Sequence, residues 1–145
     1  MSRTPERGFT LIEMMVVIAV IAVLAAVVTP LVFRNVGDAR AAAARSQIET
    51  FALALDAHRL DTDYYPSTEQ GLEALTERPA DAAERGWRGP YLRRAVSSDP
   101  WGRPYLYRSP GDSSQAGYDL ATLGRDGVAG GLGEDADIVS WRGDP

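Results

Sequence analysis

The fold is decided by one stretch of sequence, GFTLIEMMVVIAVIAVLAAVV, which covers residues 8–28. A single carboxylate, Glu13, stands near its start, and no polar residue follows from Met14 to Val28. A charge inside a membrane costs about 2.5–3.5 kcal/mol on insertion scales, so such a residue usually has a partner and a function. We therefore expect Glu13 to have a specific task.

The apolar stretch allows three interpretations. A secretory signal peptide would be cut near residues 23–25, but the apolar run continues beyond that point and carries Glu13. A plain transmembrane anchor needs ~20 apolar residues, and residues 14–33 supply that length. The third interpretation is a transmembrane helix preceded by a short leader, residues 1–8. Arginines lie on both sides of the stretch, so the distribution of charge does not decide its orientation.

The composition argues against several classes of function. The chain has 145 residues and a net charge of −5, which suits one domain of ordinary size. Its basic residues are scattered arginines, whereas a nucleic-acid surface needs a basic stripe. The chain has no cysteine, so disulfides, thiolate catalysis and zinc–thiolate sites are excluded. The single histidine, His58, has no plausible nucleophile near it in sequence, and we expect no catalytic residue and no enzyme.

Helical signals continue after the apolar stretch. Residues 38–60 are rich in alanine and carry an apolar stripe at three- and four-residue spacing, formed by Ile48, Phe51, Ala52 and Leu55. These signals predict one helix from about Leu11 to Leu60. Pro30 would either kink or locally melt this helix, or be tolerated near the membrane boundary.

The remainder of the chain predicts a small globular part. Ser67 and Gln70 are expected to form a capping box before a short helix that runs through Leu72 and Leu75 and stops before Pro79. Three short strands are expected within residues 105–108, 118–122 and 138–141, with the first two antiparallel. The predicted fold class is α+β, with a long N-terminal helix packed by its second half against a small antiparallel sheet and a structured C-terminal loop.

Three groups of residues carry a resemblance to a known family. Gly8, Glu13 and the apolar run resemble the class III leader of type IV pilins and pseudopilins. The segments YPSTEQGLEAL at 65–75 and DPWGRPY at 99–105 are similar to major pseudopilins of type II secretion systems. The segments YDL at 118–120, LGRDG at 123–127 and ADI at 136–138, with Trp141, match the same family. The resemblance covers essentially the whole chain and implies a type IV pilin-like fold.

The resemblance implies a domain organisation and a processing route. Residues 1–8 would be a cleaved leader, residues 9–33 the transmembrane and assembly helix, and residues 34–145 a periplasmic globular domain. That domain would include the second half of the helix, about 34–60. A prepilin peptidase would cut after Gly8 and methylate the new amino terminus of Phe9. The chain would be a single-pass inner-membrane protein with its C-terminal domain in the periplasm.

The implied function is structural. The chain would be a subunit of the periplasmic pseudopilus of a type II secretion system, polymerising through its N-terminal helix to drive export of folded proteins across the outer membrane. Its implied partners are further copies of itself, minor pseudopilins, the prepilin peptidase and the inner-membrane assembly platform, with no nucleic acid. The alternative is a type IV pilus or competence pilin subunit. A membrane-anchored binding or sensor domain is a third hypothesis.

Two explanations of Glu13 remain open at this point. Glu13 is four residues from Phe9, so both lie on one helix face about one turn apart. Glu13 either pairs with the amine of its own Phe9 near the headgroups, or snorkels toward them, or it meets the amine of Phe9 in a neighbouring subunit during assembly. In the last case, the neutralisation of two charges in apolar surroundings would favour the correct register.

The C-terminal loop, residues 123–137, combines acidic residues with glycines. Calcium takes six to eight oxygen ligands, and glycines allow carbonyl groups to turn inward. The spacing does not fit an EF-hand, so the residues alone leave a solvated acidic loop and a metal site open. The resemblance implies a structural calcium ion, whose expected ligands are the carbonyls of Leu123 and Val128 and the carboxylates of Asp126 and of Asp135 or Asp137, with Glu134 as a further candidate.

Arg125 is a departure from the family pattern, in which this position of the C-terminal loop is usually alanine. Its guanidinium would either reduce the local negative potential or point outward.

Overall fold

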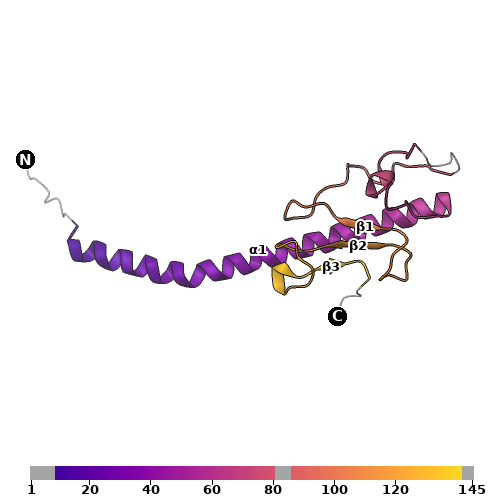
Figure 1. Cartoon of the computed structure of the whole chain (residues 1–145). Coiled ribbons are helices and arrows are strands. Elements are labelled where there is room, and N and C mark those ends of the chain that lie inside the picture. Colours follow the sequence, from indigo (N-terminus) through magenta and orange to yellow (C-terminus); the bar gives the residue numbers. More distant parts are fainter. Residues whose placement is uncertain (1–8, 81–85, 142–145) are drawn as a thin grey trace, which may run out of the picture. The chain divides into compact units, whose positions relative to one another are not determined.

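The structure is a computed structural model that describes residues 9–80 and 86–141, without the side chains of residues 29–34 (Figure 1). The chain divides into a first unit, residues 1–36, and a second unit, residues 37–145. The predicted leader, residues 1–8, lies outside the described residues.

The helix α1 spans Leu11–Thr62 and is 52 residues long. Thr10 caps its start, because the Thr10 hydroxyl accepts a hydrogen bond from the backbone N–H of Glu13 at 3.3 Å. The helical backbone continues through Pro30 and Gly37. The local melting that Pro30 would permit is therefore not observed, and the prediction of one long helix is confirmed.

The end of α1 is fixed by its last turn. The Thr62 hydroxyl donates a hydrogen bond to the carbonyl of His58 at 2.8 Å. Asp63 follows with φ 68°, a left-handed conformation that ends the helical backbone. The helix therefore ends two residues beyond the predicted boundary.

A three-stranded antiparallel sheet lies in the second unit, in the order β1-β2-β3 (Figure 1). Its strands are β1 (Leu106–Arg108), β2 (Asp119–Thr122) and β3 (Ile138–Val139). Tyr107 pairs with Leu120, and Thr122 pairs with Ile138. The three predicted strands are confirmed, each somewhat shorter than the predicted segment.

The core of the second unit joins α1 to the sheet. Apolar side chains recur on one face of α1 at helical spacing, and those that are buried there are Ala44, Ile48, Phe51, Ala54 and Leu55. They form one cluster with Leu120 of β2 and Ile138 of β3. Full burial of a leucine, isoleucine or phenylalanine side chain contributes about 1.5–3 kcal/mol. The predicted α+β fold is confirmed, and Ala52 of the predicted stripe is only partly buried.

The predicted capping box connects α1 to the next element. The Ser67 N–H donates to Oε1 of Gln70 at 2.9 Å, and the Gln70 N–H donates to Oγ of Ser67 at 3.2 Å. These reciprocal bonds confirm the predicted capping box. The helix that follows is the 3₁₀ helix η1 (Leu72–Leu75), whose Leu72 and Leu75 are buried in the core.

Asp99 organises a tight turn before β1. One carboxylate oxygen of Asp99 accepts hydrogen bonds from the N–H groups of Trp101, at 3.0 Å, and Arg103, at 2.8 Å. Its other oxygen accepts the hydroxyl proton of the buried Thr122 on β2. The turn around Pro100 and Gly102 is thus tied to the sheet through one buried carboxylate.

His58 is buried near the end of α1. Its Nδ1 donates a hydrogen bond to the carbonyl of Tyr64 at 3.1 Å. The rings of Tyr64 and Tyr91 pack edge-on against the imidazole. Burial lowers the pKa of His58 below its ordinary value, and the bond to Tyr64 and the nearby charge of Asp61 oppose this. The residue is thus part of the packing of the second unit.

Replacement of Asp99 by alanine is expected to destabilise the second unit. The change removes the acceptor of two N–H groups and of a buried hydroxyl, and each buried donor left unpaired costs about 1–3 kcal/mol. Thermal unfolding of the full chain in detergent, followed by circular dichroism, measures the effect. Asp112→Ala is the control, since it removes only an exposed partner of Arg108. Equal Tm shifts in the two variants would contradict the prediction.

Acidification is expected to destabilise the protein through His58. Because the folded-state pKa of His58 lies below its ordinary value of about 6.5, the unfolded chain binds the proton more readily. Well above pH 6.5, His58 is neutral in both states and does not affect the pH dependence of stability. As the pH falls below that value, proton uptake by the unfolded chain lowers the free energy of unfolding. The Tm of the wild type should therefore drop more between pH 7.5 and 5.5 than the Tm of His58→Asn. The same pH dependence in both proteins would refute the role of His58.

Candidate functional site

The start of α1 brings together the residues predicted for processing and assembly. Phe9 precedes the helix and is exposed, and Glu13 lies in the first helical turn. A carboxylate in this position interacts favourably with the positive end of the helix dipole. Gly8 lies outside the described residues. In the uncleaved chain the Phe9 nitrogen belongs to a peptide bond, so the pairing of Glu13 with an amine stays a prediction.

Thr10 is the functional residue of this end that the sequence reading missed. Thr10 and Glu13 have the T-x-x-E spacing of a capping box, and the Thr10 hydroxyl accepts the Glu13 N–H. The signal was therefore present in the sequence. By capping the helix, Thr10 fixes where Glu13 stands relative to Phe9.

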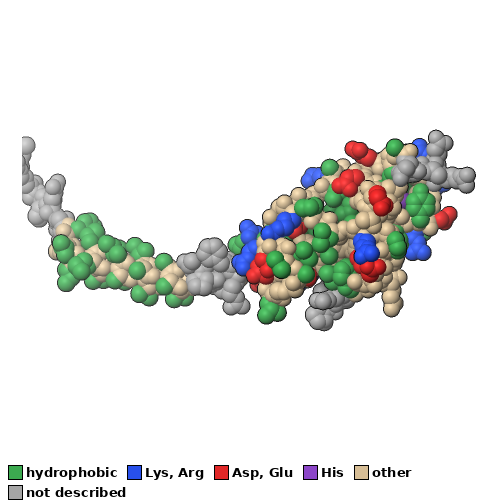
Figure 2. Space-filling view, in the orientation of Figure 1, with side chains coloured by type: hydrophobic (Ala, Val, Ile, Leu, Met, Phe, Trp, Pro, Cys, Tyr) green, Lys and Arg blue, Asp and Glu red, His purple; other side chains and the backbone are tan. Residues whose placement is uncertain are grey.

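The following part of α1 is apolar on all its faces. Residues 11–28 are exposed throughout, and this segment is long and apolar enough to cross a membrane. Figure 2 shows hydrophobic side chains gathered along this part of the helix. A helix that is apolar all round requires lipid or other helices as its surroundings. Its alanines, such as Ala19 and Ala22, allow neighbouring helices to approach closely.

The C-terminal loop is a second candidate site. Its two limbs are joined by the backbone, because the Arg125 N–H donates to the carbonyl of Glu134 at 2.8 Å. Gly124 has φ 63°, and a Cβ atom there would lie 2.7 Å from the same carbonyl oxygen. Glycine is therefore required for the close approach of the limbs. The 3₁₀ helix η2 (Gly133–Asp135) lies in the second limb.

Two of the predicted ligand carboxylates bond to the backbone of the loop. Oδ1 of Asp126 accepts the N–H of Val128 at 3.0 Å, and Oδ2 of Asp137 accepts the N–H of Gly130 at 2.9 Å. Oδ1 of Asp137 is buried and has no hydrogen-bond partner among the described residues. A buried carboxylate oxygen without a partner is unusual.

The other two predicted ligand carboxylates bond to Arg125. Asp135 accepts two hydrogen bonds from its guanidinium, from Nε at 2.9 Å and Nη2 at 3.0 Å. Glu134 accepts a third, from Nη1 at 3.2 Å. The bonds to Asp135 raise the pKa of Arg125 above its ordinary value. Arg125 therefore reduces the negative potential of the loop, which was one of the two expectations for this residue, and its guanidinium does not simply point outward.

The predicted ligands do not converge in this structure. Among residues 9–80 and 86–141, no three histidine or acidic side chains are grouped so that they could hold a metal ion. The carbonyl of Leu123 accepts the N–H of Gly127 at 3.2 Å. Both oxygens of Asp135 and one oxygen of Glu134, Oε2, bond to Arg125, whereas Asp126 and Asp137 bond to backbone N–H groups of the loop.

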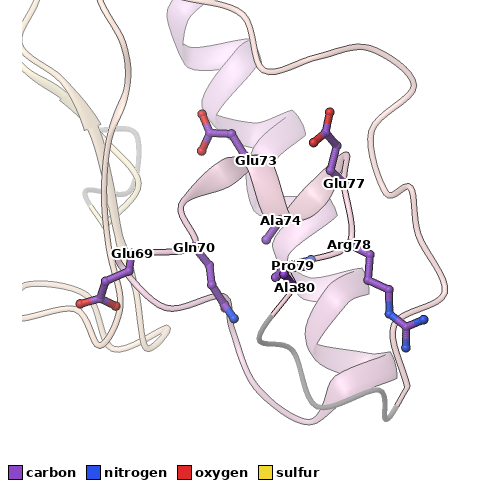
Figure 3. Close-up of a pocket in the computed structure, with 8 residues that line it drawn as sticks. All are labelled: Glu69, Gln70, Glu73, Ala74, Glu77, Arg78, Pro79 and Ala80. Carbon is purple, nitrogen blue, oxygen red and sulfur yellow. The ribbon is translucent and has the colours of Figure 1, made fainter.

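A surface hollow of about 340 Å³ lies beside η1, lined by Glu69, Gln70, Glu73, Ala74, Glu77, Arg78, Pro79 and Ala80. Figure 3 shows that its charged side chains do not converge, since Glu69 and Arg78 point to opposite sides. This hollow therefore provides no acid–base pair.

Two family models match the chain and together cover both units. The model described as type II secretion system (T2SS), protein G matches residues 31–141. The model described as prokaryotic N-terminal methylation motif matches residues 3–29, which include Gly8, Phe9 and Glu13.

Curated relatives agree with these models. The type II secretion system core protein G of Pseudomonas aeruginosa is 42% identical over 142 residues, which are 97% of this chain and 99% of that protein. The core protein G of Vibrio cholerae is 43% identical over 138 residues, which are 94% of this chain and 92% of that protein.

A solved structure gives the same answer for the fold. The crystal structure of the major pseudopilin from the type 2 secretion system of enterohaemorrhagic Escherichia coli matches with a TM-score of 0.61 and 38% identity. The match covers 74% of this chain and 90% of that chain. Since these likenesses extend over the apolar helix, the sheet and the loop, the chain belongs to the type II secretion system protein G family.

Proposed function

We propose that this chain is the major structural subunit of a periplasmic pseudopilus, which polymerises through α1 and drives export of folded proteins across the outer membrane. The observation that carries the proposal is the exposed apolar segment 11–28 of α1, headed by Glu13, in a member of the protein G family. The matched proteins are type II secretion proteins, which supports this function over a type IV pilus or competence pilin. The names of these relatives describe secretion components and no catalytic activity, in keeping with a subunit that is not an enzyme.

The first step of this function is processing at the membrane. Before assembly, residues 11–28 of α1 anchor the chain in the inner membrane, with the second unit in the periplasm. A prepilin peptidase removes residues 1–8 and methylates the amine of Phe9. The match of residues 3–29 to the N-terminal methylation motif supports this step.

The second step is the entry of the subunit into the filament. An apolar helix gains little from leaving lipid for other apolar helices, so apolar contact alone specifies no register. Glu13 supplies register if it meets the amine of Phe9 on a neighbouring subunit, because misplaced charges in apolar surroundings stay unpaired. Further copies of the chain, minor pseudopilins and the inner-membrane assembly platform are the partners in this step.

Replacement of Glu13 by alanine is expected to block assembly while membrane insertion and processing continue. The change removes a charged partner but keeps the Thr10 cap, which binds the backbone N–H of residue 13. Membrane fractionation and mass spectrometry of the mature N-terminus report insertion, cleavage and methylation. Sheared-filament yield and the amount of secreted protein report function, and both should fall at least about tenfold, as expected for the loss of a buried charge pair.

Glu49→Ala is the matched control, since Glu49 is an exposed glutamate on the same helix in the second unit. It should form filaments and support secretion like the wild type. Normal filament yield and secretion by Glu13→Ala would refute the assembly role of Glu13.

We further propose that the C-terminal loop holds a structural calcium ion. The residues that fit this role are Asp126 and Asp137 through carboxylate oxygens, and Leu123 and Val128 through carbonyls. The support is the buried Oδ1 of Asp137, which has no partner among the described residues. The ion would supply positive charge to that oxygen, and this chain's carboxylates and carbonyls would hold the limbs of the loop around it.

Calcium is expected to raise the Tm of the full chain in detergent relative to the same protein in chelator, because it binds the folded loop only. Asp137→Asn should lose most of this shift, since it removes the charge at the unpartnered oxygen. Asp112→Asn, at an exposed site outside the loop, should keep the shift. Magnesium tests whether the effect is specific, and equal Tm values in calcium and chelator would disprove the calcium site.

A further inference from the structure

Arg125 bridges the two limbs of the C-terminal loop. It lies on the first limb, and both of its acidic partners, Glu134 and Asp135, lie on the second. The pair with Asp135 is bidentate, with Nε and Nη2 each bonded to a different carboxylate oxygen. Bidentate arginine–carboxylate pairs fix geometry as well as charge. We call this set, Arg125 with Glu134 and Asp135, the Arg125 clamp.

The backbone holds the Arg125 clamp in place. The Arg125 N–H donates to the carbonyl of Glu134, so the side chain starts from a position already beside its partners. The carbonyl of the preceding Gly124 accepts a hydrogen bond from Nη1 of Arg103 at 2.8 Å. The entropy lost when the guanidinium binds is therefore smaller than for an arginine on a free loop.

The charge of the loop gives the clamp its importance. Residues 123–137 contain four carboxylates, Asp126, Glu134, Asp135 and Asp137, and Arg125 is the only basic residue in this range. Without a cation these carboxylates repel one another and favour an open loop. The partners of the clamp are mostly shielded, with side chains 23% exposed for Glu134 and 30% for Asp135, whereas Arg125 is 57% exposed.

The clamp also connects the loop to α1 within the second unit. Gly37 of α1 is buried, and a Cβ atom there would clash with the side chain of Glu134. The side chain of Glu134 therefore lies directly against the helix. By holding Glu134, Arg125 fixes where the loop rests on this part of α1.

We propose that Arg125 is a built-in cation that keeps the C-terminal loop folded when no metal is bound. Arg125 bonds to both oxygens of Asp135 and to Oε2 of Glu134, so Asp126, Asp137 and the loop carbonyls would be the main ligands of a bound calcium ion. The loop of this chain thus depends less on calcium than a loop with alanine at this position. The role of Arg125 in keeping the metal-free loop folded is independent of the proposed calcium site. The lower dependence of the loop on calcium rests on that site.

The test compares the full chain in detergent with Arg125→Ala, Arg125→Lys and Asp135→Asn, each in chelator and in calcium. Hydrogen exchange measured by mass spectrometry over residues 123–141 reports local opening, and thermal unfolding reports stability. In chelator, Arg125→Ala should exchange about tenfold faster across the loop and melt at a lower temperature. Arg125→Lys should recover part of the loss, because it keeps the charge without the bidentate geometry.

Arg108→Ala is the matched control, because it removes an arginine of β1 that forms an exposed ion pair with Asp112. It should leave loop exchange unchanged. In calcium, the difference between Arg125→Ala and the wild type should shrink, since the ion replaces part of the missing charge. A double-variant cycle with Asp135→Asn should show coupling between the two residues.

The outcomes separate the two proposals. If Arg125→Ala exchanges like Arg108→Ala in chelator, the clamp is refuted. If Arg125→Ala opens the loop in chelator but neither protein responds to calcium, the clamp stands and the calcium site fails. If the difference in loop exchange between Arg125→Ala and the wild type is larger in calcium than in chelator, the idea that Arg125 and calcium both stabilise the folded loop is refuted.

Discussion

One continuous helix with two different kinds of surface is the constraint on which the structure depends. Residues 14–28 of α1 are apolar on every face, whereas the part in the second unit buries a single stripe that includes Ile48, Phe51 and Leu55. The first kind of surface requires lipid or other helices. The second is satisfied by the chain's own sheet. The same helix therefore folds the second unit and leaves an assembly surface that no other described part of the chain covers.

The C-terminal loop shows how the second unit completes its fold away from that helix. Its limbs are brought together by glycines and backbone hydrogen bonds, and its four carboxylates then need positive charge nearby. Arg125 meets this need for Glu134 and Asp135, while Asp137 keeps one buried oxygen that has no partner within the part of the chain that the structure describes. The loop thus divides its carboxylates between two that bond to Arg125 and two that bond to backbone N–H groups. This division is specific to a chain with arginine at this position.

Features set by local sequence were predictable, and features set by distant contacts were not. The stripe of α1, the capping box of Ser67 and Gln70, and the three strands all follow from periodicity or short spacing. The Thr10 cap has the same kind of signal and was overlooked. The Arg125 clamp joins residues nine and ten positions apart through a loop whose closure depends on Gly124. From the sequence alone, the guanidinium of Arg125 could either reduce the negative potential of the loop or point outward, and only the contacts within the folded loop decide between the two. Likewise, the bond between Asp99 and Thr122 spans 23 residues and depends on the packing of a turn against β2.

The small size of the sheet has a consequence for how the subunits behave when crowded. Its two edge strands, β1 and β3, have only three and two residues, and prolines at 104 and 110 flank β1. Proline has no N–H to donate, and edges this short offer little template for another chain. Subunits held side by side at high local concentration are therefore protected from edge-to-edge aggregation.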